Sequence, residues 1–432
     1  MNIFVKVAVG ISGVFYLYFL MNIILVNHYR EPTEKYTKGQ QPYKLFLVIP
    51  VLNEEHVITR TIDRLSAELS QLPKSIQAQI VAVDDNSGDH SLLALTSSKS
   101  PYLQVLHRAG NDELGKGAVL NTAVDYIYHT LAVNFDPTKT IIGVFDADAF
   151  MTQPDLAHAV ARFEHDSELT MLQTGVGIYN RGTWLTQMQN FEFMGVNNAT
   201  QQLRNRLGQG IASGNGQFVR LDLARKNPWG NSLLEDLEFT IRTWLIGGKT
   251  GFDHTLVVQQ EGVEKVLPFF QQRVRWCQGS LQCMHYLPAL WRSRHANRFQ
   301  KVDTAVWIMM PFTGCITPVA GIVALIVLMN RTLADLQFGW HHLAIIAIIA
   351  ITLIVCVLSA NIYLRNYASV HQKIKVAPAL LQSLSFQGYL LIVSLTPYFA
   401  VYRQIRGYTN WTKTKHGLAK ARPVYAKLND SY

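Results

Sequence analysis

Ile141-Ile142-Gly143-Val144-Phe145-Asp146-Ala147-Asp148 is the stretch that decides the fold. Five uncharged residues run directly into two carboxylates that stand two positions apart. A short, continuous apolar run of this kind predicts a strand, Ile141–Phe145, that is buried on both faces of a sheet. In such sheets ligands bind just beyond the carboxyl ends of the strands. The sequence therefore places Asp146 and Asp148 at a ligand-binding edge.

Similar runs precede this stretch and alternate with helical patterns. Strands are predicted at Lys44–Val51, Gln79–Val83 and Leu103–His107. Apolar residues at helical spacing predict helices over Glu54–Leu72 and Gly115–Leu131. Strands that alternate with helices indicate an α/β sheet covered by helices on both faces.

Polar clusters follow the first two strands as well. Asn53-Glu54 comes after the first, and Asp84 to Asp89 holds three acids after the second. Asp84 and Asp85 suit the N–H and hydroxyl donors of a nucleoside. An Asx turn, with Asp89 capping the next helix, is the structural alternative for part of this segment.

Asp146-Ala147-Asp148 suits a divalent cation. Mg²⁺ takes hard oxygen ligands and often uses one or two carboxylates together with substrate phosphates. Such a pair would hold a metal that neutralises a leaving diphosphate. A turn or a helix cap before Pro154 is the structural alternative.

The segment from Gly110 to Gly117 nearly matches a phosphate-binding loop between a strand and a helix. Gly117 stands where Ser or Thr would bind Mg²⁺, which weighs against an ATPase. Lys116 at a helix start is still well placed to meet a diphosphate, because free N–H groups and the helix dipole favour anions there. A glycine-rich turn with a solvated lysine is the alternative.

Two further motifs carry candidate chemistry. Glu235-Asp236 opens a predicted helix, where a carboxylate can cap the helix or act as the general base on an acceptor hydroxyl. Gln272, Arg275 and Trp276 share one face of another predicted helix. Arginine binds phosphate in a fork geometry and tryptophan offers a stacking face for a sugar, although an amphipathic interfacial helix also fits.

The rest of the chain is apolar in blocks. It has 432 residues, of which 49% are hydrophobic and 16% charged, with a net charge of +9. Val7–Val26, Thr304–Met329, Leu343–Leu364 and Val376–Tyr402 contain no Asp, Glu, Lys or Arg. Each is long enough to cross a membrane as a helix. The first is expected to be a retained anchor rather than a cleaved signal peptide.

Basic residues orient these runs. They flank the soluble segment, so the positive-inside rule predicts that it is cytoplasmic. The tail from Arg403 to Tyr432 holds seven Lys/Arg against one acid, which suits either phosphate contact or a juxtamembrane position. Polar residues and Pro397 interrupt the fourth run, which predicts a broken, interfacial or re-entrant element with a cytoplasmic tail. Because the excess positive charge lies next to the apolar runs, no nucleic-acid partner is expected. The four cysteines show neither zinc-ligand spacing nor a disulfide framework.

The motifs, taken in order, resemble one known family. The series resembles glycosyltransferase family 2, and more narrowly the membrane-bound synthases of cellulose, hyaluronan, chitin and poly-N-acetylglucosamine. It comprises Val48-Ile49-Pro50-Val51-Leu52-Asn53-Glu54, Asp84-Asp85-Asn86-Ser87, Gly115-Lys116-Gly117, Asp146-Ala147-Asp148, Glu235-Asp236 and Gln272-Arg273-Val274-Arg275-Trp276.

The resemblance implies a GT-A (Rossmann-like) fold and inversion at the anomeric carbon. It implies a donor site for a UDP-sugar of glucose or N-acetylglucosamine type, a metal site for Mg²⁺ or Mn²⁺, a general base, and an acceptor and diphosphate site. The residues in these roles would be Glu54, Asp84, Asp85, Lys116 and Asp146 for the donor; Asp148 with Asp146 for the metal; Asp236 as base; and Glu235, Gln272, Arg275 and Trp276 for the acceptor and diphosphate. A tryptophan-containing segment near the chain end, Trp411 to Thr414 with Lys413, resembles one that closes over the nucleotide.

These patterns together predict the organisation and the activity. We expect an anchor at 1–27, a linker at 28–43, the GT-A domain with its interfacial helix at 44–300, a transmembrane or interfacial region at 301–402 and a basic tail at 403–432. The expected function is processive synthesis of a β-glycan at the cell membrane. Single transfer to a lipid and a non-catalytic scaffold or transporter are the alternatives. Few spans are available to enclose a polymer, so a partner subunit, an oligomer or a glycolipid product would be needed.

Overall fold

The computed structural model describes residues 3–29, 41–110, 115–335, 337–370 and 374–408. Its centre is a seven-stranded sheet with the order β3-β2-β1-β4-β6-β5-β7. Strand β6 is antiparallel to both of its neighbours, and the other strand pairs are parallel. The strands are β1 (Tyr43–Val51), β2 (Ile76–Asp84), β3 (Leu103–His107), β4 (Thr140–Val144), β5 (Leu169–Ile178), β6 (Gln217–Arg220) and β7 (Lys249–Gln260).

Alternate side chains of β1 enter two separate cores, which confirms that helices cover both faces of the sheet. Leu47 and its neighbours on one face pack with α2 (Ile58–Leu69) and α5 (Gln153–His165). Val48, on the other face, packs with α4 (Lys116–Tyr126). The remaining helical elements of this part are α3 (Ser91–Thr96), η1 (Ile127–Leu131), η2 (Pro137–Lys139), α6 (Trp184–Phe191), η3 (Glu192–Asn197), α7 (Asn198–Leu207), α8 (Leu221–Lys226) and α9 (Glu235–Leu245).

The predicted elements are present, with two differences that have local causes. Helix α2 runs from Ile58 to Leu69 rather than from Glu54 to Leu72, because Glu54–Val57 forms a turn in which the N–H groups of Val57 and Ile58 both donate to the Glu54 carbonyl, and turns follow Leu69. The predicted helix up to Leu131 is α-helical only as far as Tyr126 and ends in the π-helical turn η1.

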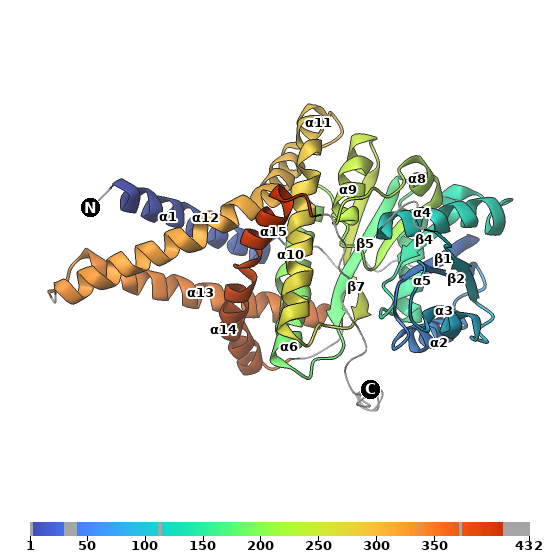
Figure 1. Ribbon diagram of the computed structural model, residues 1–432, viewed down its shortest axis with the longest axis horizontal. Coiled ribbons are helices and arrows are strands. Elements are labelled where there is room, and N and C mark those ends of the chain that lie inside the picture. The colour runs from blue at the N-terminus through green and yellow to red at the C-terminus, as the bar shows by residue number, and fades with distance from the viewer. Residues whose placement is uncertain (1–2, 30–40, 111–114, 336, 371–373, 409–432) are drawn as a thin grey trace.

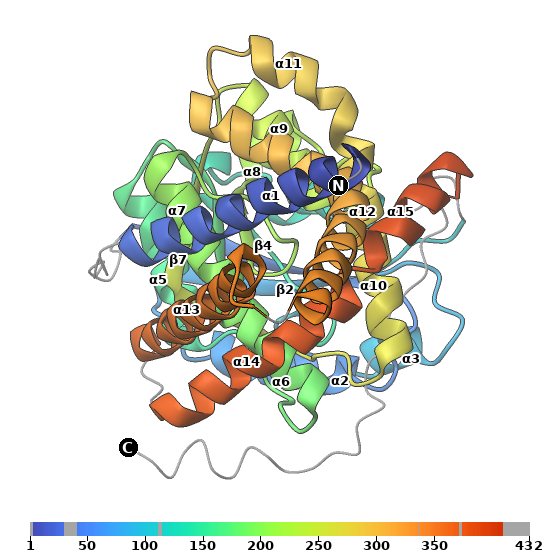
Figure 2. The ribbon, with the colours of Figure 1, turned by 90° about the vertical axis from the view of Figure 1, so that its left-hand side faces the viewer.

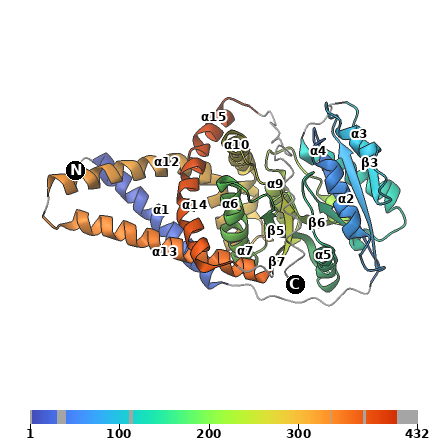
Figure 3. The same ribbon diagram turned by 90° about the horizontal axis from the view of Figure 1, so that it is seen from below.

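A second layer of helices lies between the sheet and a projecting set. Helix α10 (Val266–Gln282) runs beside α15 (Thr396–Ile405), and both lie near α14 (Val376–Val393) (Figure 1, Figure 3). Between α10 and the projecting helices come η4 (Cys283–Tyr286) and α11 (Leu287–Arg292).

The projecting set consists of α1 (Ile3–His28), α12 (Arg298–Ala334) and α13 (Trp340–Ser369), which pack on one another. Within the part of the chain that the structure describes, three segments are long and apolar enough to cross a membrane: Arg298–Ala334, Trp340–Ser369 and Val376–Ile405. This length and composition indicate association with a membrane.

The fourth apolar run is broken, as predicted. Helix α14 ends at Val393 and α15 begins at Thr396. Figure 2 looks roughly along α12 and α13 and shows α14 running across their base rather than beside them, and Figures 1 and 3 agree. Pro397 lies in the first turn of α15, just after the break, whereas the polar residues Gln382 to Gly388 lie inside the continuous helix α14 and do not interrupt it.

Candidate active site

Charged side chains from four separate elements meet beyond the end of β4. The Lys116 ammonium lies 2.7 Å from Asp146 and 3.7 Å from Glu235. Asp236 lies close enough for its charge to act on both Lys116 and Arg275. Lys116 begins α4, Asp146 follows β4, Glu235 and Asp236 begin α9, and Arg275 lies on α10. The structure thus brings together five of the predicted residues.

Asp236 has the environment expected of a general base. It is 7% exposed, and its carboxylate accepts the N–H of Leu237 at 2.7 Å. Burial, and then the charge of Glu235, raise the pKa of Asp236 to about 7, against the lowering effects of that hydrogen bond and of Lys116. A carboxylate with this pKa can accept a proton near neutral pH.

Two glycines allow Lys116 to lie where it does. Gly115 has a φ of +105° and starts the helix, while a Cβ on Gly117 would lie 2.1 Å from the carbonyl oxygen of Gly230. This close approach explains why position 117 carries neither Ser nor Thr. Burial lowers the pKa of Lys116, but Asp146 and then Glu235 outweigh it, so the pKa lies above its usual value.

Asp146 and Asp148 face different surroundings. The Asp146 side chain is 40% exposed, and its N–H donates to Asn215 at 3.3 Å. Asp148 is 5% exposed and accepts the N–H of Glu261 at 2.8 Å. Among the residues that the structure describes, no group of three or more His, Cys, Asp or Glu could hold a metal by itself. Because Mg²⁺ often uses only one or two carboxylates together with substrate phosphates, the chemistry of Asp146 and Asp148 is compatible with an ion that takes most of its ligands from a diphosphate.

A second polar cluster lies where β1, β2 and β3 end together. Asp84, fully buried, is 2.9 Å from the His107 ring, and Arg108 donates to Asp85 at 2.7 Å. Burial, and to a lesser extent Asp84, raise the pKa of Asp85, while Arg108 lowers it. Glu54 is also buried here, and its N–H donates to Ser91 at 2.6 Å. Asp85, whose side chain is 18% exposed, is the accessible member of the acidic pair.

Asp89 forms the turn that the structural alternative proposed, although the residue that caps α3 is His90, which makes no side-chain cap bond. Asp89 accepts the N–H and the hydroxyl of Ser91 at the start of α3. Part of the acidic segment is therefore a helix-start motif, while Asp84 and Asp85 point elsewhere.

Helix α10 is held on the sheet domain by a buried ion pair. Arg273, 7% exposed, makes two 2.7 Å contacts with the two carboxylate oxygens of Glu192, and Tyr389 of α14 also donates to Glu192. The guanidinium lies 4.5 Å from the centroid of Trp276, which packs edge-on against Phe193. Arg273 thus faces the core, whereas Arg275 of the same helix faces the acidic cluster.

The remaining predicted residues are accounted for as follows. Gln272 is half-buried on α10, and Trp276 is held among aromatic and cationic neighbours. Trp411 and Lys413 lie outside the described residues.

Sequence reasoning missed three residues of the site. His107 and Arg108 pair with the two acids because β2 and β3 are in register, Asp84 opposite His107. In the sequence, the two adjacent basic residues His107 and Arg108 at the end of a predicted strand could have indicated these partners of the acids. Asn215, which also donates to Gln260 at 2.7 Å, lies between two glycines of positive φ, and Gly-Asn-Gly marks such a turn.

Comparisons with known proteins identify the family of the chain. A model described as "Glycosyl transferase family group 2" matches residues 141–364, and one described as "Glycosyl transferase family 2" matches residues 46–226. The chain is 30% identical over 305 residues to a beta-monoglucosyldiacylglycerol synthase of Nostoc, covering 69% of this chain and 61% of that protein. It is 26% identical over 256 residues to a probable glucomannan 4-beta-mannosyltransferase of Arabidopsis thaliana, covering 56% and 45%. The chain thus spans about three fifths of the first relative and less than half of the second.

Among solved structures, the mannosyltransferase PcManGT from Pyrobaculum calidifontis in complex with GDP-Man and Mn2+ is similar, with a TM-score of 0.58 and 14% identity. The match covers 93% of this chain and 96% of that one. Sheet order, strand-end acids and this likeness define a GT-A glycosyltransferase fold. The chain belongs to glycosyl transferase family 2.

Proposed function

We propose that this protein transfers a hexose from a UDP-sugar to a hydroxyl group of a membrane lipid, in one step and with inversion at the anomeric carbon. The observation that carries the proposal is the meeting of Lys116, Asp146, Asp236 and Arg275 beyond β4. These groups supply a base, a carboxylate for the metal and two cations for a leaving diphosphate.

Asp236 acts as the general base. It removes the proton of the acceptor hydroxyl as the oxygen attacks the sugar C1 from the face opposite the diphosphate. Lys116 and Arg275 bind the diphosphate oxygens, whose negative charge grows as the bond to C1 breaks. Glu235 keeps Lys116 in place through their 3.7 Å contact.

Asp146 and Asp148 would hold Mg²⁺ or Mn²⁺, because both offer hard oxygen atoms at the same strand end. When bound, the ion supplies positive charge to the diphosphate. The structurally similar mannosyltransferase is in complex with Mn2+, which supports a divalent ion in this role.

The strand-end cluster of Asp84, Asp85 and Glu54 would receive the nucleoside. A carboxylate accepts hydrogen bonds from base N–H groups or ribose hydroxyls. Arg108, which donates to Asp85, would have to release or share that carboxylate when the nucleotide enters.

A lipid acceptor is preferred to a growing polymer for two reasons. The relative at 30% identity is named as a synthase of a glucosyl diacylglycerol. In addition, α10 carries Arg275 into the site and packs against α15, which belongs to the apolar segment Val376–Ile405. The acceptor side of the site therefore adjoins an apolar layer of membrane-length helices. A site at this layer fits an enzyme that works at a membrane surface, and the proposed cytoplasmic position of the catalytic domain at the cell membrane rests on the basic residues that flank the apolar runs. The glucomannan relative keeps processive synthesis as the second candidate.

Purified full-length protein in lipid vesicles tests the proposal. The vesicles would contain diacylglycerol and be supplied with radiolabelled UDP-glucose, UDP-N-acetylglucosamine or GDP-mannose. We expect a single β-linked glycolipid from a UDP-sugar, identified by mass spectrometry and NMR. A ladder of polymer would favour processive synthesis. Turnover of only the GDP-sugar would refute the donor assignment.

A further inference from the structure

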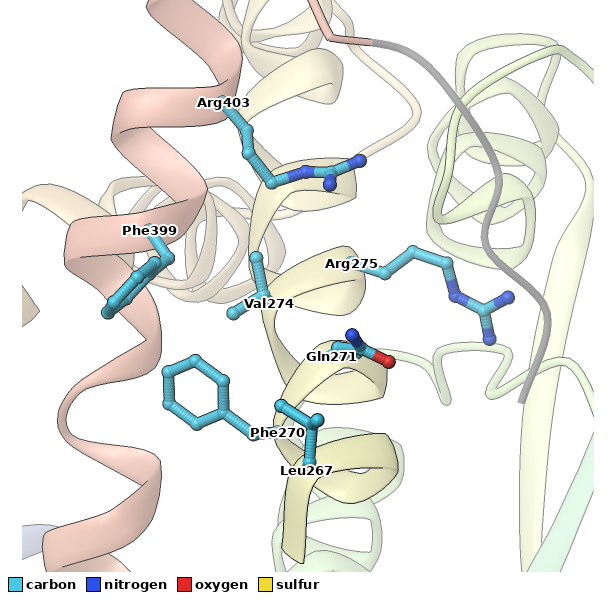
Figure 4. Close-up of a pocket in the computed structure, with 7 residues that line it drawn as sticks. All are labelled: Leu267, Phe270, Gln271, Val274, Arg275, Phe399 and Arg403. Carbon is cyan, nitrogen blue, oxygen red and sulfur yellow. The ribbon is translucent and has the colours of Figure 1, made fainter. Parts of the chain in front are cut away.

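A cleft of about 250 Å³ lies between α10 and α15. Its walls are apolar at one end and cationic at the other. Figure 4 shows the guanidinium groups of Arg275 and Arg403 pointing to the same side, away from the aromatic rings. Its lining consists of Leu267, Phe270, Gln271, Val274, Arg275, Phe399 and Arg403.

The apolar end adjoins surface that suits hydrocarbon. Leu267 is 65% exposed and Phe399 is 53% exposed, and their neighbours Val266 and Tyr402 are 54% and 51% exposed. An exposed apolar patch of this kind on a protein with membrane-length helices is expected to face lipid. The cleft therefore opens toward the hydrophobic layer.

The polar end belongs to the catalytic centre. Arg275 experiences the charges of Glu235, Asp146 and Asp236. Leu267 and Arg275 are eight positions apart on α10, a rise of about 12 Å. The cleft thus runs from the apolar surface to Arg275, which lies within electrostatic reach of the general base Asp236.

Resting on the proposed function, we propose that this cleft receives one acyl chain of the acceptor lipid and presents its hydroxyl group to Asp236. Arg403, whose Nε–H donates to Gln278 at 2.9 Å, is held at the mouth of the polar end. There it can donate to the ester carbonyl of a glycerolipid.

Size and charge select the occupant. Pockets for whole drug-sized ligands measure roughly 300–1,000 Å³, so this cleft suits part of a single chain rather than a complete lipid. At the polar end, the three cations Lys116, Arg275 and Arg403 stand against three carboxylates, so the charges balance and leave no excess of positive charge for an anionic headgroup. A neutral lipid with a free hydroxyl, such as a diacylglycerol, fits this balance.

The cleft acts by alignment more than by affinity. A chain that leaves the bilayer for an apolar cleft exchanges one hydrocarbon environment for another and gains little hydrophobic free energy. The benefit is orientation, because a hydroxyl held beside its base reacts as part of one complex. Blocking the cleft should therefore impair transfer to the lipid and leave binding and hydrolysis of the UDP-sugar unchanged.

Two paired double variants test the inference. Leu267→Trp with Phe399→Trp places bulk in the cleft, while Val266→Trp with Tyr402→Trp adds similar bulk on the same helices outside it. We expect the first pair to raise KM for diacylglycerol at least tenfold in vesicles. Hydrolysis of the UDP-sugar, which needs no lipid, should stay within twofold in both pairs. Equal KM values for the two pairs would overturn the inference and leave the proposed function standing.

A direct measurement locates the chain. Diacylglycerol with a diazirine near the end of one acyl chain is photolysed in vesicles with the full-length protein, and the labelled peptides are identified. We expect label on Val266–Gln282 and Thr396–Ile405, reduced in the cleft variant. Label confined to α12 and α13 would overturn the inference. If the wild-type protein glycosylates no lipid, the proposed function fails, and this mapping alone decides whether the cleft holds an acyl chain.

A charge test completes the design. Phosphatidic acid is added as a competitor to the wild-type protein and to the Arg403→Gln variant. We expect weak inhibition of both. Strong inhibition that the substitution abolishes would show that the cleft holds an anionic lipid, and would overturn the assignment to a neutral one.

Discussion

The Glu192→Ala substitution should destabilise the protein and misplace Arg275, although Glu192 lies outside the acidic cluster. Glu192 holds both ends of the Arg273 guanidinium at 2.7 Å, and Arg273 is only 7% exposed. Removing one partner of a buried pair leaves the other charge uncompensated, at a cost of about 3–5 kcal/mol. For a domain of this size each kcal/mol lowers the melting temperature by about 2–4 °C. We therefore expect a fall of about 10 °C.

The assay combines heating with activity. Protein in detergent is heated for a fixed time, and the soluble fraction and its rate of UDP-sugar hydrolysis are measured. Because α10 carries both Arg273 and Arg275, we expect kcat to fall even at temperatures where Glu192→Ala remains folded. The exposed acid Glu168, whose side chain is 81% exposed, provides the control. Glu168→Ala should lower the melting temperature only slightly, because exposed ion pairs contribute about 0–1 kcal/mol.

A compensating variant separates charge from packing. Combining Glu192→Leu, Arg273→Met and Tyr389→Phe removes the charges and the hydroxyl that donates to Glu192 while it keeps apolar volume. Exchanging a buried pair for apolar residues is often neutral, so most of the lost stability should return. If Glu192→Ala melts within 2 °C of the wild type, or the triple variant is less stable than the single one, the ion pair does not hold α10 as we infer.

Three further predictions concern the catalytic cluster. Asp236→Asn should abolish transfer, while UDP should still bind in calorimetry; a normal rate of transfer in the variant would contradict the role of Asp236 as base. In the wild type, kcat/KM should fall as the pH drops below about 7, because protonation of Asp236 removes the base. Lys116→Met should move that acid limb upward by about one to two pH units. A Cβ placed on Gly214 would lie 3.5 Å from the Lys116 ammonium and 3.4 Å from the Asp236 carboxylate, so the two groups are at most about 7 Å apart and interact by about 2 kcal/mol. The Lys116→Arg variant keeps the positive charge and should leave the acid limb in place. An acid limb that does not move in Lys116→Met would refute the coupling. Asp148→Ala should remove the metal-dependent part of donor binding, and a donor Kd that responds to EDTA as in the wild type would exclude that role.

The sequence by itself determined the sheet and the edge at which the chemistry lies. Uncharged runs such as Ile141–Phe145 have few alternatives to a buried strand, and the carboxyl ends of parallel strands share one edge. Asp84, Asp146 and their neighbours could therefore be placed near one another before any distance was known. The break in the fourth apolar run was predictable only in part, because Pro397 lies just after it but the polar residues Gln382 to Gly388 lie inside the continuous helix α14.

Only the tertiary structure decided which of these charges meet and which way each faces. Lys116 and Glu235 are 119 positions apart, and their contact depends on how α4 and α9 pack, which no local pattern encodes. Arg273 and Arg275 are two positions apart on one helix, yet one enters the core and the other the catalytic cluster. The mixed sheet, the pairing of His107 with Asp84 and the cleft between α10 and α15 likewise arise from contacts between distant segments. Local sequence sets the period of burial along each element, whereas the direction in which elements pack depends on the whole fold.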